Sequence, residues 1–137
     1  MQIRQTPPPA SSRMLPDNFR AVRLHLAREP EHPEGDKQHG YDFLIPLKDD
    51  GHIDPKTFRA YAEACRVRRF RPGEADATGR LEYRPGGIWA IRYGADVDGT
   101  EVGFRFHDER FIPGEYVSIE GDDDRTRTFK VWEVRRP

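Results

Sequence analysis

Apolar and charged residues alternate along most of the chain with a period of two, which is typical of strands that bury one face. The first such segment, 19–27, places Val22 and two leucines on the predicted inner face. The segment 41–47 repeats the pattern, and Pro46 predicts that this strand ends there or lies at an edge, because proline has no amide hydrogen to donate. The chain therefore begins with two half-buried strands, which a polar loop at 29–40 separates.

The later part of the chain continues this pattern in short pieces divided by glycine and proline. Its predicted strands are 65–71, 79–84, 88–93, 101–107, 115–120 and 126–135. In the fourth of these, Val102, Phe104 and Phe106 are predicted to point inward. Glu101 and Arg105 then point outward into solvent.

One helix interrupts the strands. Asp54 followed by Pro55 predicts a helix start, since aspartate caps free backbone amides and proline fits the first helical position. Apolar side chains then recur at i, i+3, i+4 and i+7 from Phe58 to Cys65, which predicts an amphipathic helix of about three turns. Cys65 lies on the buried face of this helix, where it is expected to be a core residue.

These elements predict a mainly β fold, a small, partly open antiparallel β-barrel or roll of about six to seven strands with one short helix. A two-layer sheet packed on the helix is the alternative, because periodicity does not separate the two. Residues 1–18, rich in proline and serine, are predicted to form a disordered tail. Residues 19–137 are predicted to form a single β-rich domain with one hydrophobic core.

Composition and charge indicate which class of partner and which cellular location to expect for this domain. Charged residues make up 34% of the chain, yet the formal net charge is only −1, which argues against a dedicated DNA-coating protein. The single Cys65 excludes an internal disulfide, and the amino terminus lacks the apolar stretch of a secretory signal. We therefore expect a cytoplasmic protein without a membrane span, and its many arginines are bacterial-like.

Charge is unevenly distributed along the chain. Residues 59–92 hold eight arginines against four acidic residues, and these arginines fall mainly on predicted strands. The outward positions of the middle strands predict an arginine-rich face made of Arg66, Arg68, Arg80, Arg84, Arg92 and Arg105. Such a face suits an anionic partner, because guanidinium groups bind phosphates and carboxylates and stack on bases. The alternative is an ordinary solvated face with cross-strand Arg–Glu pairs, which Glu82 and Glu101 favour.

Motifs for catalysis or metal binding are weak. His32, Asp36 and His39 share one loop, but no second cysteine or rigid frame completes a zinc site. The acidic turns lack the ligand spacing of a calcium loop, and no serine lies in a nucleophile elbow. We expect no catalytic residue, metal or cofactor.

Our functional hypothesis is a non-enzymatic binding module that contacts an anionic partner, nucleic acid or acidic protein, through the arginine-rich face. One alternative is a small ligand-binding or enzymatic barrel with a site near the 29–41 loop, where His39 and Tyr41 are the first candidates. Another is a structural subunit of a complex. The last strand is apolar on both faces, with Trp132 on one of them, which suggests a homodimer contact.

Overall fold

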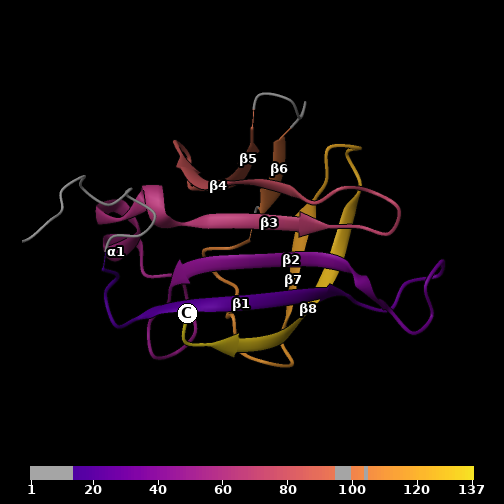
Figure 1. Cartoon of the computed structure of the whole chain (residues 1–137), viewed down its shortest axis with the longest axis horizontal. Helices are drawn as coiled ribbons and strands as arrows, with labels where there is room; N and C mark the ends of the chain where they lie inside the picture. Colours follow the sequence, from indigo (N-terminus) through magenta and orange to yellow (C-terminus); the bar gives the residue numbers. More distant parts are fainter. Residues whose placement is uncertain (1–13, 95–99, 104) are drawn as a thin grey trace, which may run out of the picture.

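The chain folds into eight strands with one short helix and one 3-10 turn in a computed structural model that describes residues 14–94, 100–103 and 105–137 (Figure 1). The strands are β1 (Phe19–Leu26), β2 (Asp36–Pro46), β3 (Arg66–Phe70), β4 (Ala77–Arg84), β5 (Ile88–Tyr93), β6 (Thr100–Gly103), β7 (Tyr116–Glu120) and β8 (Thr126–Arg135). The helical elements between β2 and β3 are α1 (Pro55–Ala60) and η2 (Ala62–Ala64). Most of the predicted tail, residues 1–13, lies outside the described residues, whereas Leu15 packs against the core.

Each strand pairs in antiparallel fashion with the next, and β8 pairs with β1, so that the sheet closes into a barrel. The closing contact runs from Ala21↔Arg135 to Leu26↔Phe129. The predicted antiparallel barrel is confirmed, although it is closed and has eight strands instead of six or seven. Alternation assigns residues to faces, but it does not say whether the first and last strands meet.

β2 begins earlier than the sequence predicted. Its first residues fall in the segment predicted to be a loop, yet Leu26 of β1 pairs with Asp36, and His25 pairs with Gly40. The register shifts between these two pairs, so the early part of β2 accommodates extra residues as a bulge. The first four residues of β2, 36–39, are all polar and are exposed or half-buried, so they show no alternation of apolar and polar side chains.

Buried aromatic rings fill the middle of the barrel. Phe43, Phe106 and Phe111 pack edge to face, with ring centres 5.5–6.2 Å apart. This geometry is the favoured one for aromatic pairs and adds about 0.5–1.5 kcal/mol per pair beyond the burial of area. The rings thus compensate for a chain in which hydrophobic residues make up only 35% of the sequence.

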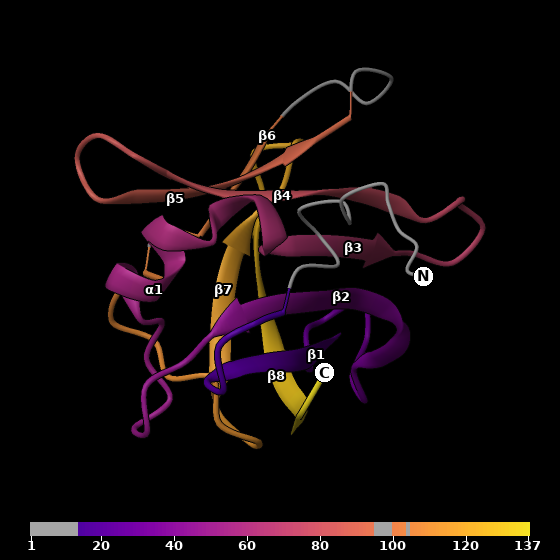
Figure 2. The ribbon, with the colours of Figure 1, turned by 60° about the vertical axis from the view of Figure 1, so that its left-hand side comes forward.

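α1 lies against one end of the barrel in both ribbon views (Figures 1 and 2). The predicted cap is confirmed: Asp54 Oδ1 accepts from the amides of Lys56 at 3.1 Å and Thr57 at 3.3 Å, and Pro55 occupies the first turn. The predicted length of three turns is wrong, because Tyr61 leaves the helical region at φ −131°. No helix among the described residues is long and apolar enough to cross a membrane.

Cys65 is fully buried, as predicted, although it follows η2 and does not lie on a continuous helix. Burial, together with the nearby Glu63 charge, raises the pKa of its thiol to about 12. The thiol therefore stays protonated and packs as a small apolar group.

Removal of the Asp54 cap tests how far this turn supports the barrel end. We expect Asp54→Ala to lower the free energy of unfolding by about 1–2 kcal/mol, because the side chain also accepts from Asn18 Nδ2 at 3.1 Å and so ties α1 to the start of β1. Urea unfolding measures the change, with Asp49→Ala at an exposed neighbouring position as the control. Equal stability of the two variants would contradict this role.

The segment 101–107 differs from its predicted pattern. β6 ends at Gly103, and Glu101 points into the barrel with an exposed fraction of 0%, whereas Val102 is only half-buried. Phe106 is buried from a turn, in which its amide donates to Gly103 O at 3.2 Å. A Cβ at Gly103 would lie 2.3 Å from the Phe106 ring, so glycine is what permits this packing. Phe104 lies outside the described residues.

The last strand matches its predicted bounds, but its two faces differ. Phe129 and Val131 are buried, whereas Trp132 is 49% exposed and is therefore not a core residue. The Trp132 ring stacks on His25 at 4.9 Å and carries the Lys37 ammonium 4.7 Å from its centre. The register shift between β1 and β8 lies beside Trp132, which places the ring on the outer surface.

Candidate functional site

Three arginines face outward side by side on neighbouring strands. Arg66 of β3 pairs with Arg80 of β4, and Arg80 pairs in turn with Arg92 of β5. The residues that follow or precede them in the strands, such as Leu81 and Ile91, are buried inside the barrel, so the arginines point to solvent. We call Arg66, Arg80 and Arg92 the arginine row.

The arginine row is only partly neutralised. Like charges directly opposite one another on adjacent strands repel and cost stability. Arg92 Nε donates to Glu82 Oε2 at 2.9 Å, and Arg84 lies 3.2 Å from the other oxygen of the same carboxylate. Arg66 and Arg80 have no ion pair with any residue in the described part of the chain. The guanidinium groups of Arg66 and Arg80 therefore lack a neutralising carboxylate among the described residues.

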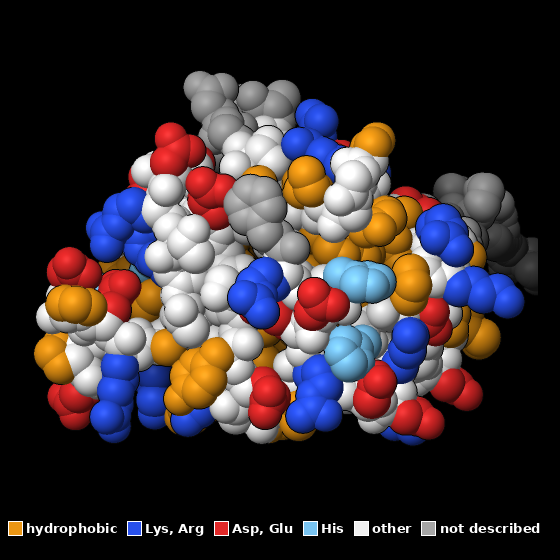
Figure 3. Space-filling model, turned by 180° about the vertical axis from the view of Figure 1, so that it is seen from behind, with side chains coloured by type: hydrophobic (Ala, Val, Ile, Leu, Met, Phe, Trp, Pro, Cys, Tyr) orange, Lys and Arg blue, Asp and Glu red, His pale blue; other side chains and the backbone are white. Residues whose placement is uncertain are grey.

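The surface around the arginine row is hollowed. A depression of about 380 Å³ is lined by all three arginines together with Thr78, Gly79, Tyr93 and Gly94. By contrast, the face opposite to that of Figure 1 carries basic and acidic side chains interleaved over its surface (Figure 3).

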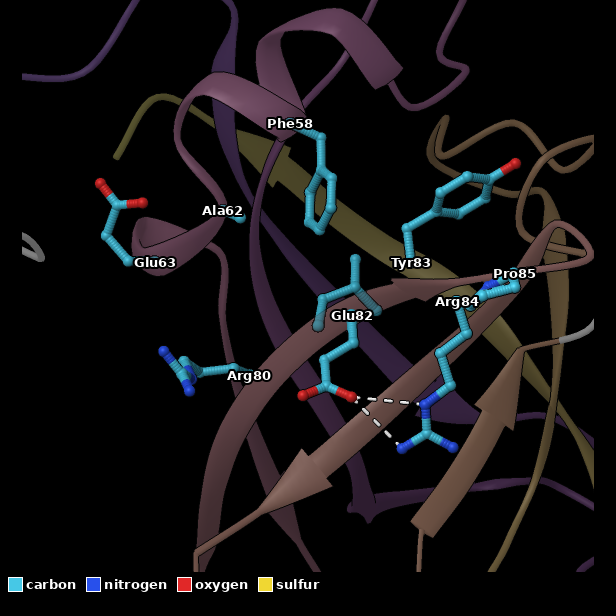
Figure 4. Close-up of a pocket in the computed structure, with 9 residues that line it drawn as sticks. Phe58, Ala62, Glu63, Arg80, Glu82, Tyr83, Arg84 and Pro85 are labelled. Carbon is cyan, nitrogen blue, oxygen red and sulfur yellow. Dashed lines mark hydrogen bonds and ion pairs between the residues drawn. The ribbon is translucent and has the colours of Figure 1, made fainter.

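A second hollow, which we call the aromatic pocket, adjoins the row at Arg80. It has a volume of about 360 Å³ and is lined by Phe58, Ala62, Glu63, Arg80, Leu81, Glu82, Tyr83, Arg84 and Pro85. The rings of Phe58 and Tyr83 flank it from α1 and β4 (Figure 4). Tyr83 is 43% exposed and rests on Trp89, with ring centres 4.6 Å apart. The pocket thus contains an exposed aromatic ring on the inner face of β4, whereas Arg80 and Arg84 project from the outer face of the same strand.

Four of the six predicted arginines therefore lie together, and two do not. The four are Arg66, Arg80, Arg84 and Arg92. Arg68 is held by Asp42 and by Asp76, the latter at 2.8 Å, in a separate cluster that also includes Arg23. Arg105 is exposed in the turn after β6, because the strand that was predicted to carry it ends at Gly103.

His39 and Tyr41 lie at the opposite end of the barrel from α1, beside a buried cluster of charged side chains. The carboxylate of Glu101 is at its centre and accepts from Tyr41 Oη at 3.0 Å and from Tyr93 Oη. Arg69 Nη1 and Arg71 Nη2 each donate to the other carboxylate oxygen at 3.1 Å. We call Tyr41, Arg69, Arg71, Tyr93 and Glu101 the barrel-end cluster.

The barrel-end cluster is strongly shielded from water. Burial, with a further contribution from the Glu101 charge, raises the pKa values of Tyr41 and Tyr93 well above their usual range. Both hydroxyls therefore remain hydrogen-bond donors. Burial also lowers the pKa of His39 to about 4, with smaller effects from the Arg71 and Arg127 charges, so its ring is neutral near pH 7.

The shifted pKa of His39 makes stability depend on pH. From pH 6.5 down to about 4, the unfolded chain takes up a proton that the folded chain excludes, so stability is lost as the pH falls through this window. We expect His39→Gln to remove roughly 1–2 kcal/mol of that loss, because the ring is only partly buried. Urea unfolding at both ends of the window measures it, with exposed His107→Gln as the control. Identical pH slopes in wild type and His39→Gln would contradict the assignment.

Several residues of the barrel-end cluster and the aromatic pocket were not predicted from the sequence. Arg69 follows the alternation of β3 and shares the inner face with buried Val67, so its phase alone indicated a buried arginine. Glu101 carried no such signal, because the apolar pattern after it indicated the opposite phase. The alternation of the predicted strand 79–84 places Tyr83 on the inner face with Leu81, yet its ring is 43% exposed because it lies near the end of β4.

No known protein family, no curated protein and no solved structure matches this chain. Within the described residues, no three His, Cys, Asp or Glu side chains come together as ligands for a metal ion.

Proposed function

We propose that the β3–β5 region of the barrel binds single-stranded nucleic acid. In this proposal, the arginine row contacts backbone phosphates, and Tyr83 in the aromatic pocket stacks on a base. Grooves of this kind combine positive charge with aromatic rings, which is the usual arrangement for binding single strands without strong sequence preference. The observation that carries the proposal is the continuity of the arginine row with an exposed aromatic ring through Arg80, which lines both hollows.

The charge balance supports an anionic partner. Around the two hollows, four arginines face two glutamates, Glu63 and Glu82. Glu82 is shared between Arg84 and Arg92, so Arg66 and Arg80 keep their charges available. An ordinary solvated face would pair each guanidinium with a carboxylate on a neighbouring strand, whereas here arginine lies opposite arginine.

The aromatic pocket favours nucleic acid over an acidic protein. Its volume of about 360 Å³ lies in the range of sites that take a small flat ligand. An acidic peptide would use the arginines but would gain little from an exposed tyrosine, whereas every base has a face on which a ring can stack.

A tyrosine substitution tests this distinction. We expect Tyr83→Ala to weaken binding of a labelled oligothymidylate of about 12 nucleotides by roughly 5- to 150-fold, since one base–aromatic stack is worth about 1–3 kcal/mol. Binding of inorganic polyphosphate, which has no bases, should not change. Fluorescence anisotropy, with polyphosphate and polyglutamate as competitors, measures both.

The controls use matched tyrosine variants. Tyr116→Ala removes an exposed ring on β7, far along the chain from the aromatic pocket, and should leave binding unchanged. Tyr83→Phe keeps the ring and should bind as wild type does. Equal losses of oligothymidylate and polyphosphate in Tyr83→Ala would contradict base stacking, and tighter binding of polyglutamate than of either would favour an acidic protein as the partner.

A cytoplasmic location and a homodimer contact through β8 complete the proposal. The first is inferred from the single cysteine, and the second from the apolar residues on both faces of the strand. Trp132 and Tyr116, exposed on neighbouring strands, are the residues through which such a contact would form. A molecular mass in solution that stays at 15.9 kDa over all concentrations would contradict the dimer.

A further inference from the structure

Two buried nitrogen atoms at the barrel end have no hydrogen-bond partner among the described residues. They are Nε of Arg71 and Nε2 of His39. The antiparallel pairing of β2 with β3 includes Gly40↔Phe70, so continuing this register by one residue places His39 opposite Arg71. Buried polar atoms are rarely left without a partner, because each one costs about 1–3 kcal/mol. Two such atoms on facing residues therefore indicate a missing acceptor.

The charge at this place is suited to an anion. Arg69 and Arg71, with side-chain exposures of 8% and 18%, share the one carboxylate of fully buried Glu101. Two cations thus meet one anion in the buried part of the cluster, which leaves an excess positive charge. Outside the buried part of the cluster, Glu74 Oε1 lies 4.0 Å from Arg71 Nη1, but the Glu74 side chain is half exposed. Arg127 Nη2 is already paired with Asp123 Oδ2 at 3.0 Å.

Each donor is also held in place. The Arg71 guanidinium is fixed through its Nη2 bond to Glu101, which leaves Nε as its unpaired face. The His39 ring packs edge to face on Phe129, with ring centres 5.6 Å apart. Donors that are positioned before a ligand arrives lose little entropy when it binds.

We propose that the end of the barrel opposite α1 binds a small oxyanion, a carboxylate or phosphate group, between Arg71 and His39. The oxyanion accepts from Arg71 Nε and from the His39 imidazole, and it offsets the unbalanced charge of Arg69 and Arg71. Some closed barrels of eight strands hold one small ligand in their interior. The site is independent of the arginine row, which lies on the outer surface.

The pKa of His39 depends on the charged and titratable groups around its ring. They are Arg71 after β3, Arg127 on β8, Asp36 on β2 and His32 in the loop before β2. An anion bound next to the ring offsets the two arginine charges and stabilises the protonated imidazole. Binding is therefore expected to shift the titration of His39 toward neutral pH and to tighten as the solution is acidified.

Nuclear magnetic resonance of the histidine rings tests the proposal. Inorganic phosphate and acetate are titrated separately into the full chain at constant ionic strength. We expect a saturable shift of the His39 signal, identified by its loss in His39→Gln, with either anion, and the stronger response tells phosphate from carboxylate. Arg71→Gln should weaken the response at least about tenfold, whereas Arg125→Gln, which removes an exposed charge, should not.

The titration of the wild-type protein tests anion binding at His39 even if a variant does not fold. A His39 signal that does not move, or that moves linearly together with the other four histidines, overturns the proposal. So does an unchanged response in a folded Arg71→Gln protein. None of these results bears on the binding of oligothymidylate at the arginine row, so the two proposals fail separately.

Discussion

Glu101→Leu is expected to lower the free energy of unfolding by about 3–5 kcal/mol, the cost of removing one partner of a buried ion pair. The substitution leaves Arg69, only 8% exposed, without its carboxylate, and it leaves the hydroxyls of Tyr41 and Tyr93 without an acceptor. On the core side, the Tyr41 ring packs against the rings of Phe43 and Phe129. Urea unfolding followed by circular dichroism measures the change.

Two further variants serve as comparisons for Glu101→Leu. Glu82→Leu removes a carboxylate of the same kind from the outer surface, where we expect a loss of at most about 1 kcal/mol. Glu101→Gln keeps the shape and part of the hydrogen bonding, and an intermediate loss is expected. A loss below about 1 kcal/mol for Glu101→Leu would mean that Glu101 is not the centre of a buried network.

The triple variant Arg66→Gln, Arg80→Gln and Arg92→Gln is expected to lose most of its affinity for oligothymidylate, by about 100-fold or more at low salt. Each phosphate contact contributes about 0.7 to the slope of log affinity against log salt for a single strand, so the loss of three contacts should reduce that slope by about 2. Anisotropy titrations over a range of salt concentrations measure both quantities.

The control for this variant removes three exposed arginines elsewhere, Arg28, Arg110 and Arg136. It has the same net charge, so a similar loss in both would indicate binding to the whole charged surface. The arginine-row variant should also be at least as stable as wild type, because the substitutions remove like charges that lie directly opposite one another. A folded triple variant with unchanged affinity would contradict the role of the arginine row.

The sequence predicted the faces of most strands correctly, because alternation is a local property that burial enforces. Phe43 and Ile45 of β2 and Trp89 and Ile91 of β5 are buried as their phase indicated. The cap of α1 was equally visible, since Asp54 and Pro55 act on their own turn. These features depend on neighbours in the sequence and not on distant parts of the chain.

The barrel-end cluster could not be predicted, because it depends on contacts across the whole sheet. Glu101 is buried only since Tyr41 and Arg69, which lie far from it in the sequence, reach its carboxylate from other strands. The reversed phase at β6 has a local cause as well: Gly103 ends the strand, and Phe106 returns to the core through a turn. An apolar residue that reaches the core from a turn has the same sequence pattern as one on a strand.

The sequence predicted an arginine-rich face but not which of the arginines lie together on it. Sequence spacing placed arginines on outward positions, and the register of β3, β4 and β5 then aligned Arg66, Arg80 and Arg92. Register is set by pairing along whole strands, so the spacing of residues in the sequence does not reveal it. The spacing therefore could not distinguish Arg66 from Arg68, which lies two residues further along β3 and is held by Asp42.

Mapping of backbone amide signals during titration with oligothymidylate at low salt tests the central claim most directly. We predict that the shifted signals cluster on β3–β5, around Gly79 and Gly94 in the hollow of the arginine row and around Tyr83 in the aromatic pocket. Shifts that gather instead around Trp132, or the absence of any shift at low ionic strength, would contradict single-strand binding at this surface.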